Sequence, residues 1–275
     1  MTKTNVFKKI TDIRDFVDSC KERNQKIAFV PTMGALHDGH LSLISEAQKF
    51  SDIVIVSIFV NKAQFNDLSD YQKYPRHFDD DINKLENIGV DAIFIPCDDE
   101  IYPTNCSFKI IPSSFIDCLC AKTRVGHFDG VALVVTKLFN IVQPHQAFFG
   151  EKDFQQLLII KKLVVDLNFN IKIFGLPTHR EVSGLAMSSR NQRLSLDGLK
   201  KASMIYKVLN EIKSNPASID FQKTQLIKNG FEIDYLEIRN EHNLELDNSI
   251  KSSNSGRIFI AVYLEGIRLI DNLKI

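Results

Sequence analysis

One segment of the chain reads Ile27-Ala28-Phe29-Val30-Pro31-Thr32-Met33-Gly34-Ala35-Leu36-His37-Asp38-Gly39-His40-Leu41-Ser42-Leu43-Ile44-Ser45-Glu46-Ala47. Its first four residues predict a buried strand, and the apolar residues from Leu41 onward recur at helical spacing. The two histidines are three apart at the helix start, so they share one face beside free backbone N–H groups at the positive end of the helix dipole. Gly39 lets the backbone come close to a ligand because it has no Cβ. The segment therefore predicts a phosphate-binding site.

Short apolar strands and amphipathic helices alternate through the first two-thirds of the chain. We predict strands at Ile27–Val30, Ile53–Val60, Ala92–Ile95, Phe108–Ile111, Ala147–Phe149 and Ile171–Phe174, and helices at Asp12–Asn24, Gly39–Phe50, Tyr71–Ile88, Val131–Ile141 and Phe154–Leu167. This alternation is typical of a parallel sheet covered by helices on both faces. Ligands of such sheets bind beyond the carboxyl ends of the strands, so the histidine segment, Asn61 and Gly150 should converge on one crevice.

The pattern changes at Pro177. A polar loop leads to a helix near Leu196–Ser214, strands near Ile233–Arg239 and Arg257–Val262, and a short terminal strand, with loops at Asn215-Pro216 and Ser252–Gly256. We therefore predict an α/β fold with two domains. Residues 1–176 form a Rossmann-like, doubly wound parallel sheet, and residues 177–275 form a second, smaller α+β domain.

Composition limits the partners and the compartment. The 275-residue chain has 34 Lys+Arg and 34 Asp+Glu, so it lacks the basic excess of nucleic-acid binders, and neither a nucleic-acid partner nor a tRNA synthetase is favoured. Its five cysteines contain no Cys-x-x-Cys pair and are expected to be reduced thiols of a cytoplasmic protein. Residues 1–10 lack the apolar core of a signal peptide, and the longest apolar run, Ile53–Val60, is too short to span a bilayer, so no membrane partner is expected.

Two plainer interpretations of His37 and His40 compete with phosphate binding. They are two surface histidines at a helix start, or a zinc pair, because histidines three apart on a helix can bind one metal ion. The strand–turn–helix context argues against the first interpretation. No third ligand is close in sequence, so we assign no metal-ligating residue.

Further motifs follow in order along the chain: Val56-Ser57-Ile58-Phe59-Val60-Asn61-Lys62-Ala63-Gln64-Phe65, Gly126-His127-Phe128-Asp129-Gly130-Val131, the segment 143–157 around Phe149-Gly150-Glu151-Lys152-Asp153, and Gly184-Leu185-Ala186-Met187-Ser188-Ser189-Arg190-Asn191. Together with Pro31–His40, they resemble the pantoate–β-alanine ligase (pantothenate synthetase) family of the nucleotidyltransferase superfamily. The resemblance runs from about Lys26 to Leu194. It implies ATP-dependent condensation of pantoate with β-alanine to pantothenate, through a pantoyl-adenylate and with release of AMP and pyrophosphate. It also implies ATP as a substrate, Mg²⁺, small-molecule partners and a homodimer.

The resemblance assigns roles to individual residues. His37, His40 and Lys152 are implied to be catalytic. The implied ATP ligands are Met33, His37, His40, Gly150, Lys152, Asp153, Met187, Ser188, Ser189 and Arg190. Pantoate is implied to bind Gln64, Gln155 and Asn61, and β-alanine to bind Gln64.

The chemistry of these residue types agrees with the roles but leaves alternatives. Neutral amides can hold a small hydroxy acid, although Asn61 could equally cap loop backbone. Lys152 is unfavourably placed at a helix start unless a phosphate supplies negative charge. Asp153 could instead cap that helix.

The chain departs from the family pattern at several positions. Lys62 and Val125 replace prolines, Cys120 replaces an acidic residue, and Ser183 replaces an aspartate, which leaves the role of Arg124 open.

Two rival functions remain. The first is a nucleotidyltransferase that acts on a phosphorylated acceptor, which would need extra basic residues in place of the Asn61, Gln64 and Gln155 amides. The second is a non-enzymatic module that binds ATP without turnover.

Overall fold

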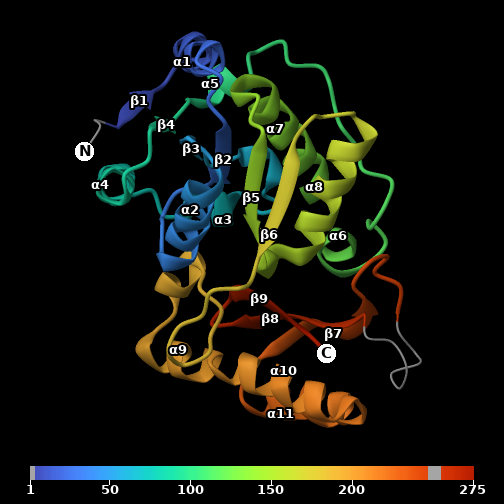
Figure 1. The fold of residues 1–275 in the computed structure, drawn as a ribbon. Coiled ribbons are helices and arrows are strands. Elements are labelled where there is room, and N and C mark those ends of the chain that lie inside the picture. The colour runs from blue at the N-terminus through green and yellow to red at the C-terminus, as the bar shows by residue number, and fades with distance from the viewer. Residues whose placement is uncertain (1–3, 247–254) are drawn as a thin grey trace. The chain divides into compact units, whose positions relative to one another are not determined.

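The computed structural model describes residues 4–246 and 255–275, and these residues form two compact units (Figure 1). Unit 1 consists of residues 4–114, 124–151 and 156–177, and unit 2 consists of 115–123, 152–155 and the described residues from 178 onward. Unit 1 contains a parallel sheet formed by β1 (Asn5–Phe7), β2 (Ile27–Thr32), β3 (Ile53–Ile58), β4 (Ala92–Phe94), β5 (Gln146–Gly150) and β6 (Lys172–Leu176). Its helices are α1 (Ile10–Glu22), α2 (Asp38–Phe50), α3 (Leu68–Gln72), α4 (Phe78–Ile88), α5 (Asp98–Ile101), α7 (His127–Val142) and most of α8 (Phe154–Asp166).

Alternate residues of the central strands face opposite helix layers. Ala28 and Val30 of β2 pack with Ile44 of α2 and Leu85 of α4 in one buried cluster. Phe29, between them, contacts Phe139 of α7 edge-to-face, with ring centroids 6.4 Å apart. Because successive strand side chains point to opposite faces, helices cover both faces of the sheet. The predicted doubly wound fold is confirmed.

The strand order places the site. The sheet runs β1-β4-β3-β2-β5-β6, so the connections reverse direction between β2 and β5. This reversal is the topological switch point at which open α/β sheets bind ligands. The histidine segment follows β2, Asn61 follows β3 and Gly150 ends β5, and these three strands are neighbours.

Some sequence-based boundaries are wrong. The predicted strand Phe108–Ile111 is irregular chain, and the Phe108 side chain is 84% exposed, so it has no partner layer to bury against. The predicted helix Tyr71–Ile88 is broken at residues 73–77, because Pro75 disfavours helical backbone at the residue before it. The short edge strand β1 was not predicted.

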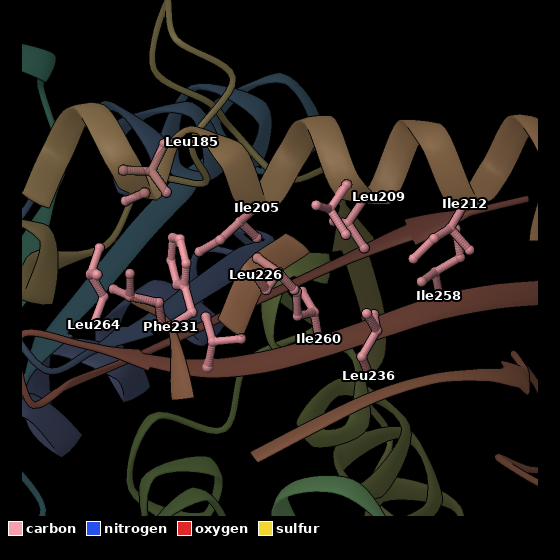
Figure 2. Packing of buried hydrophobic residues seen from close by; sticks show 14 of the residues in the cluster. Leu185, Ile205, Leu209, Ile212, Leu226, Phe231, Leu236, Ile258, Ile260 and Leu264 are labelled. Carbon is pink, nitrogen blue, oxygen red and sulfur yellow. The ribbon is translucent and has the colours of Figure 1, made fainter. Parts of the chain in front are cut away.

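Unit 2 contains the antiparallel strands β7 (Glu232–Asn240), β8 (Gly256–Leu264) and β9 (Ile267–Lys274). Its helices are α6 (Leu119–Thr123), α9 (Leu196–Ala202), α10 (Met204–Ser214) and the unpredicted α11 (Ile219–Lys228). Figure 2 shows Leu209 and Ile212 pointing toward Ile258 and Ile260 in the buried cluster. This core confirms the predicted α+β architecture, although the predicted helix Leu196–Ser214 is two helices. The predicted loop Ser252–Gly256 lies largely outside the described residues.

Within residues 4–246 and 255–275, no helix is long and apolar enough to cross a membrane. A functional domain boundary between residues 176 and 177 stays a prediction.

Candidate active site

A buried aspartate holds the turn between β2 and α2. The Asp81 carboxylate of α4, 1% exposed, accepts hydrogen bonds from the backbone N–H groups of Ala35 and Leu36, each at 2.7 Å. Lys84, one turn further along α4, donates to the Leu36 carbonyl at 2.7 Å. Gly34 has a φ of +78°, and a Cβ there would lie 2.9 Å from the Asp81 carboxylate. One face of α4 therefore fixes the backbone that leads to His37.

The two histidines lie together at the start of α2. His37 is the N-cap residue, and the His37 and His40 ring centroids are 4.1 Å apart. The backbone N–H of His37 donates to Nδ1 of His40 at 3.3 Å. Since Nδ1 accepts this bond, the proton of a neutral His40 lies on Nε2. The arrangement orients His40 to donate from Nε2, next to the N–H groups of the first helical turn.

A hydrogen-bonded chain follows β3. The Asn61 side chain is 1% exposed, and its Nδ2 donates to Oε1 of Gln64 at 2.9 Å and to the Gly130 carbonyl at 3.1 Å. The Tyr102 hydroxyl donates to Oδ1 of Asn61 at 2.8 Å. Nε2 of Gln64 lies 3.0 Å from the Met33 sulfur. The structure thus brings Met33, Asn61 and Gln64 together, and the Asn61 amide already has three partners.

Two further side chains hold the backbone of Gln64. Nδ1 of His127 lies 2.7 Å from the Gln64 carbonyl, and Arg124 donates to the same oxygen at 3.2 Å. A carbonyl only accepts, so the His127 proton is on Nδ1, and its Nε2 accepts from Arg124 at 3.1 Å. Arg124, whose role was open, therefore supports Gln64.

Helix α7 approaches this loop closely. A Cβ on Gly130 would lie 2.4 Å from the Ala63 carbonyl oxygen, a distance that real Cβ atoms essentially never show. Only glycine therefore lets α7 lie against the short helix η1 (Lys62–Gln64) in this way.

Lys152 and Asp153 lie in unit 2, in the turn before α8. Nζ of Lys152 is 3.6 Å from the Asp153 carboxylate, and their side chains are 20% and 46% exposed. The Lys152 carbonyl accepts a hydrogen bond from the Asn272 side chain at 2.9 Å, and Asn272 in turn accepts from Arg257. Lys152 is therefore anchored by its backbone, while its ammonium makes a weak, partly exposed ion pair.

Gln155, also in unit 2, has an amide bonded to backbone on both ends. Its Nε2 donates to the carbonyls of Phe115 and Cys118 at 2.7 and 2.9 Å, and its Oε1 accepts from the Cys120 N–H at 3.0 Å. Both amide hydrogens are used, so a bound ligand would have to displace one of these bonds or use the second lone pair of Oε1.

The segment Met187–Arg190 is a shaped loop of unit 2. The Met187 N–H donates to the His179 carbonyl at 3.0 Å, and the Ser188 hydroxyl caps the short helix η3 (Ser189–Arg193) by accepting from the Arg190 N–H. Arg180 donates to the Gly184 carbonyl and pairs with buried Asp271 at 2.6 Å. The start of the loop is thus bonded to His179, and the chain before it is tied to Asp271, which lies 91 residues away from Arg180.

The predicted residues divide between the units. Met33, His37, His40, Asn61, Gln64 and Gly150 lie in unit 1, and Lys152, Asp153, Gln155, Met187, Ser188, Ser189 and Arg190 lie in unit 2. Sequence reasoning missed Asp81, Tyr102 and Asn272. Asp81 could have been noticed, because an acid four residues before Leu85 falls on the apolar face of its helix. Tyr102 and Asn272 have no local signal.

Cys120 occupies the position at which the resembled family usually has an acidic residue. Its thiol lies 3.1 Å from the Tyr235 hydroxyl and 3.4 Å from Arg268. Arg268 also pairs with Asp234 at 2.7 Å. An acid is thus still present beside this arginine. Among the described residues there is no group of three or more His, Cys, Asp and Glu side chains that could hold a metal ion.

Comparison with known proteins gives concordant matches. A family model for pantoate-beta-alanine ligase matches residues 5–274. A pantothenate synthetase of Carboxydothermus hydrogenoformans is 44% identical over 279 residues, which covers 97% of each chain. One of Acinetobacter baumannii is 45% identical over 260 residues, or 90% of each chain.

Solved structures agree. A pantothenate synthetase of Thermus thermophilus matches with a TM-score of 0.91 at 35% identity, covering 98% of this chain and 99% of that one. A pantoate-beta-alanine ligase of Francisella tularensis, complexed with beta-gamma ATP and beta-alanine, matches with a TM-score of 0.88 at 39% identity, covering 98% of this chain and 97% of that one.

Proposed function

The chain belongs to the pantoate–β-alanine ligase family and catalyses the ATP-dependent condensation of pantoate with β-alanine, and we propose which of its residues carry out each step. The observation that carries the assignment is the pair of His37 and His40 at the switch point of the sheet, next to the Asn61–Gln64 amides. A phosphate site and an acid site on neighbouring strands are what an acid-activating enzyme needs. The Asn61–Gln64 pair is called the acid subsite below.

His37, His40 and the first N–H groups of α2 hold the ATP phosphates. Support comes from the convergence of a helix N-terminus, two adjacent imidazoles whose rings are tilted by 38°, and a turn fixed by Asp81. Met33 lines the nucleotide side. A Cβ on Gly150 would meet no protein atom within 4 Å, so packing within the protein does not require glycine at this position. The glycine instead leaves room for the nucleotide to contact the backbone of Gly150.

Gln64 binds the pantoate carboxylate or hydroxyls through Nε2, and the same amide later contacts β-alanine. Its Oε1 is engaged by Asn61, so Nε2 is the end that can meet an acceptor. Asn61 contacts pantoate only if one of its three present bonds yields. Gln155 binds pantoate under the same condition.

Lys152 and Arg190 neutralise the leaving pyrophosphate, with Asp153, Met187, Ser188 and Ser189 as further ATP contacts. The weak ion pair of Lys152, at 3.6 Å, supports this role, because a phosphate can compete for its ammonium. Arg190 can grip phosphate oxygens with two parallel N–H bonds.

The reaction needs no covalent enzyme intermediate. The pantoate carboxylate attacks the α-phosphorus of ATP, pyrophosphate leaves, and the amine of β-alanine then attacks the pantoyl-adenylate and releases AMP. Positioning and stabilisation of the developing negative charge supply the catalysis. No described side chain is needed as a nucleophile.

Mg²⁺ would be held mainly by the phosphate oxygens of ATP, because the proposed phosphate ligands are cationic or neutral apart from Asp153 and Mg²⁺ prefers oxygen ligands. We extend two family-level proposals to this chain, a homodimer and a cytoplasmic location. Sedimentation tests the first. The five free cysteines support the second, since they are typical of a reducing compartment.

Exchange of labelled pyrophosphate into ATP tests the two-step reaction. Exchange should require pantoate and proceed without β-alanine. Exchange without pantoate, or only with β-alanine, would falsify the adenylate mechanism.

A second test addresses the acid subsite. Gln64→Ala should weaken pantoate binding about tenfold or more, since a lost hydrogen bond to a charged group is worth roughly 1.5–3 kcal/mol. ATP binding should change little, and calorimetry with each ligand compares them. Equal weakening of both contradicts the assignment of Gln64.

A further inference from the structure

We infer that Tyr102 is a positioning residue of the acid subsite, whose hydroxyl holds Asn61 so that Gln64 presents the donor end of its amide to the substrate. The inference rests on the proposed function of Gln64. Tyr102 lies 41 residues after Asn61 in the chain and belongs to none of the motifs described above.

The direction of each hydrogen bond follows from a fixed acceptor. The Gly130 carbonyl can only accept, so the Asn61 atom at 3.1 Å from it is Nδ2. The opposite atom, Oδ1, faces the Tyr102 hydroxyl, which therefore donates. Burial raises the pKa of Tyr102 well above its usual value near 10, which keeps this hydroxyl protonated. The second hydrogen of Nδ2 points to Oε1 of Gln64 at 2.9 Å.

The donor end of the Gln64 amide is Nε2. With Oε1 accepting from Asn61, Nε2 lies on the side of the Met33 sulfur, which is a weak acceptor that a substrate oxygen can replace. The subsite therefore selects ligands that offer an acceptor, such as a carboxylate. Without the Tyr102 hydroxyl, buried Oδ1 of Asn61 loses its donor, and the amide is held less firmly.

A double-mutant cycle separates positioning from a general structural role. Tyr102→Phe removes only the hydroxyl, and pantoate is titrated into protein saturated with a non-hydrolysable ATP analogue. We expect the pantoate dissociation constant to rise about tenfold in the wild-type background and less than about twofold in the Gln64→Ala background. Affinity for the ATP analogue should be unchanged. Tyr71→Phe, which removes a hydroxyl 3.3 Å from Asp98 in the same unit, is the matched control and should bind pantoate normally.

The inference is overturned if Tyr102→Phe raises the pantoate dissociation constant by the same factor in both backgrounds. It is also overturned if affinity for the ATP analogue falls as much as affinity for pantoate. If Gln64→Ala itself leaves pantoate affinity unchanged, the proposed acid subsite is wrong and the inference falls with it. A second variant covers the case that Tyr102→Phe does not fold. Asn61→Asp places an acceptor opposite Oε1 of Gln64, so it should turn the Gln64 amide and weaken pantoate binding at least tenfold. Unchanged pantoate affinity in folded Asn61→Asp contradicts the fixed polarity.

Discussion

The Asp81 carboxylate should control both the stability and the activity of the protein through the turn before His37. Asp81→Asn keeps the shape of the side chain but replaces one acceptor oxygen with an NH₂ group. One of the two 2.7 Å hydrogen bonds, to Ala35 or Leu36, is then lost, and a backbone N–H faces another donor.

The magnitude follows from this geometry. A buried hydrogen bond to a charged group is worth roughly 1.5–3 kcal/mol, and the neutral amide recovers part of that by being easier to bury. We therefore expect Asp81→Asn to lower the free energy of unfolding by about 2 kcal/mol. The turn leads directly to His37, and a displacement of about 1 Å in a catalytic group can lower the rate on the order of 10²-fold. We expect a loss of that size in pantoate-dependent pyrophosphate exchange.

Urea unfolding and the exchange assay on the same preparation measure both effects. Asp79→Asn, on the exposed side of the first turn of α4, is the matched control for the change in charge. Wild-type stability and exchange in Asp81→Asn refute the role of the carboxylate. Lower stability with normal exchange in the folded fraction shows that the turn is positioned by other contacts, such as the Lys84 bond to Leu36.

Three further outcomes are expected. Lys152→Ala should melt close to the wild-type temperature, since its ammonium makes a weak 3.6 Å ion pair with Asp153 and a longer-range attraction to buried Asp271, while single-turnover adenylate formation falls by about 10²–10³-fold. Gly130→Ala should lower the free energy of unfolding by about 1–3 kcal/mol in urea titrations, because its Cβ overlaps the Ala63 carbonyl. Burial raises the pKa of Tyr102, so unfolded Tyr102 loses its proton near pH 10 while the folded state retains it, and stability falls as pH rises above 10. Tyr102→Phe should make that alkaline decline shallower by up to about 1.4 kcal/mol per pH unit, and an unchanged slope contradicts the assignment.

The sheet and the histidine segment were predictable because their signals are local. An apolar run, a turn and a helical repeat occupy adjacent residues between Ile27 and Ala47, and burial on both sheet faces follows from the pattern alone. The same logic failed at Phe108–Ile111, where an apolar run has no layer to cover it, and burial is a property of the whole fold.

The supporting contacts of the site were not predictable for the same reason. Asp81 accepts a hydrogen bond from the N–H group of Ala35, which lies 46 residues away in the chain. Asn272 donates to the Lys152 carbonyl across 120 residues. Such pairings depend on which strands become neighbours. The amide types of Gln64 and Gln155 indicated substrate binding, but only the structure shows that both hydrogens of the Gln155 amide are bonded to backbone carbonyls.

The bonding of Asn61 also constrains how the chain is completed during synthesis. Its amide needs the Tyr102 hydroxyl and the Gly130 carbonyl, which lie 41 and 69 residues further along the chain. A nascent chain that ends before α7 would have to bury an unsatisfied amide or leave the loop after β3 open, and the first alternative is unfavourable. The strand β3 can therefore pair early, whereas the loop that follows it acquires its final shape only after about half of the protein has left the ribosome.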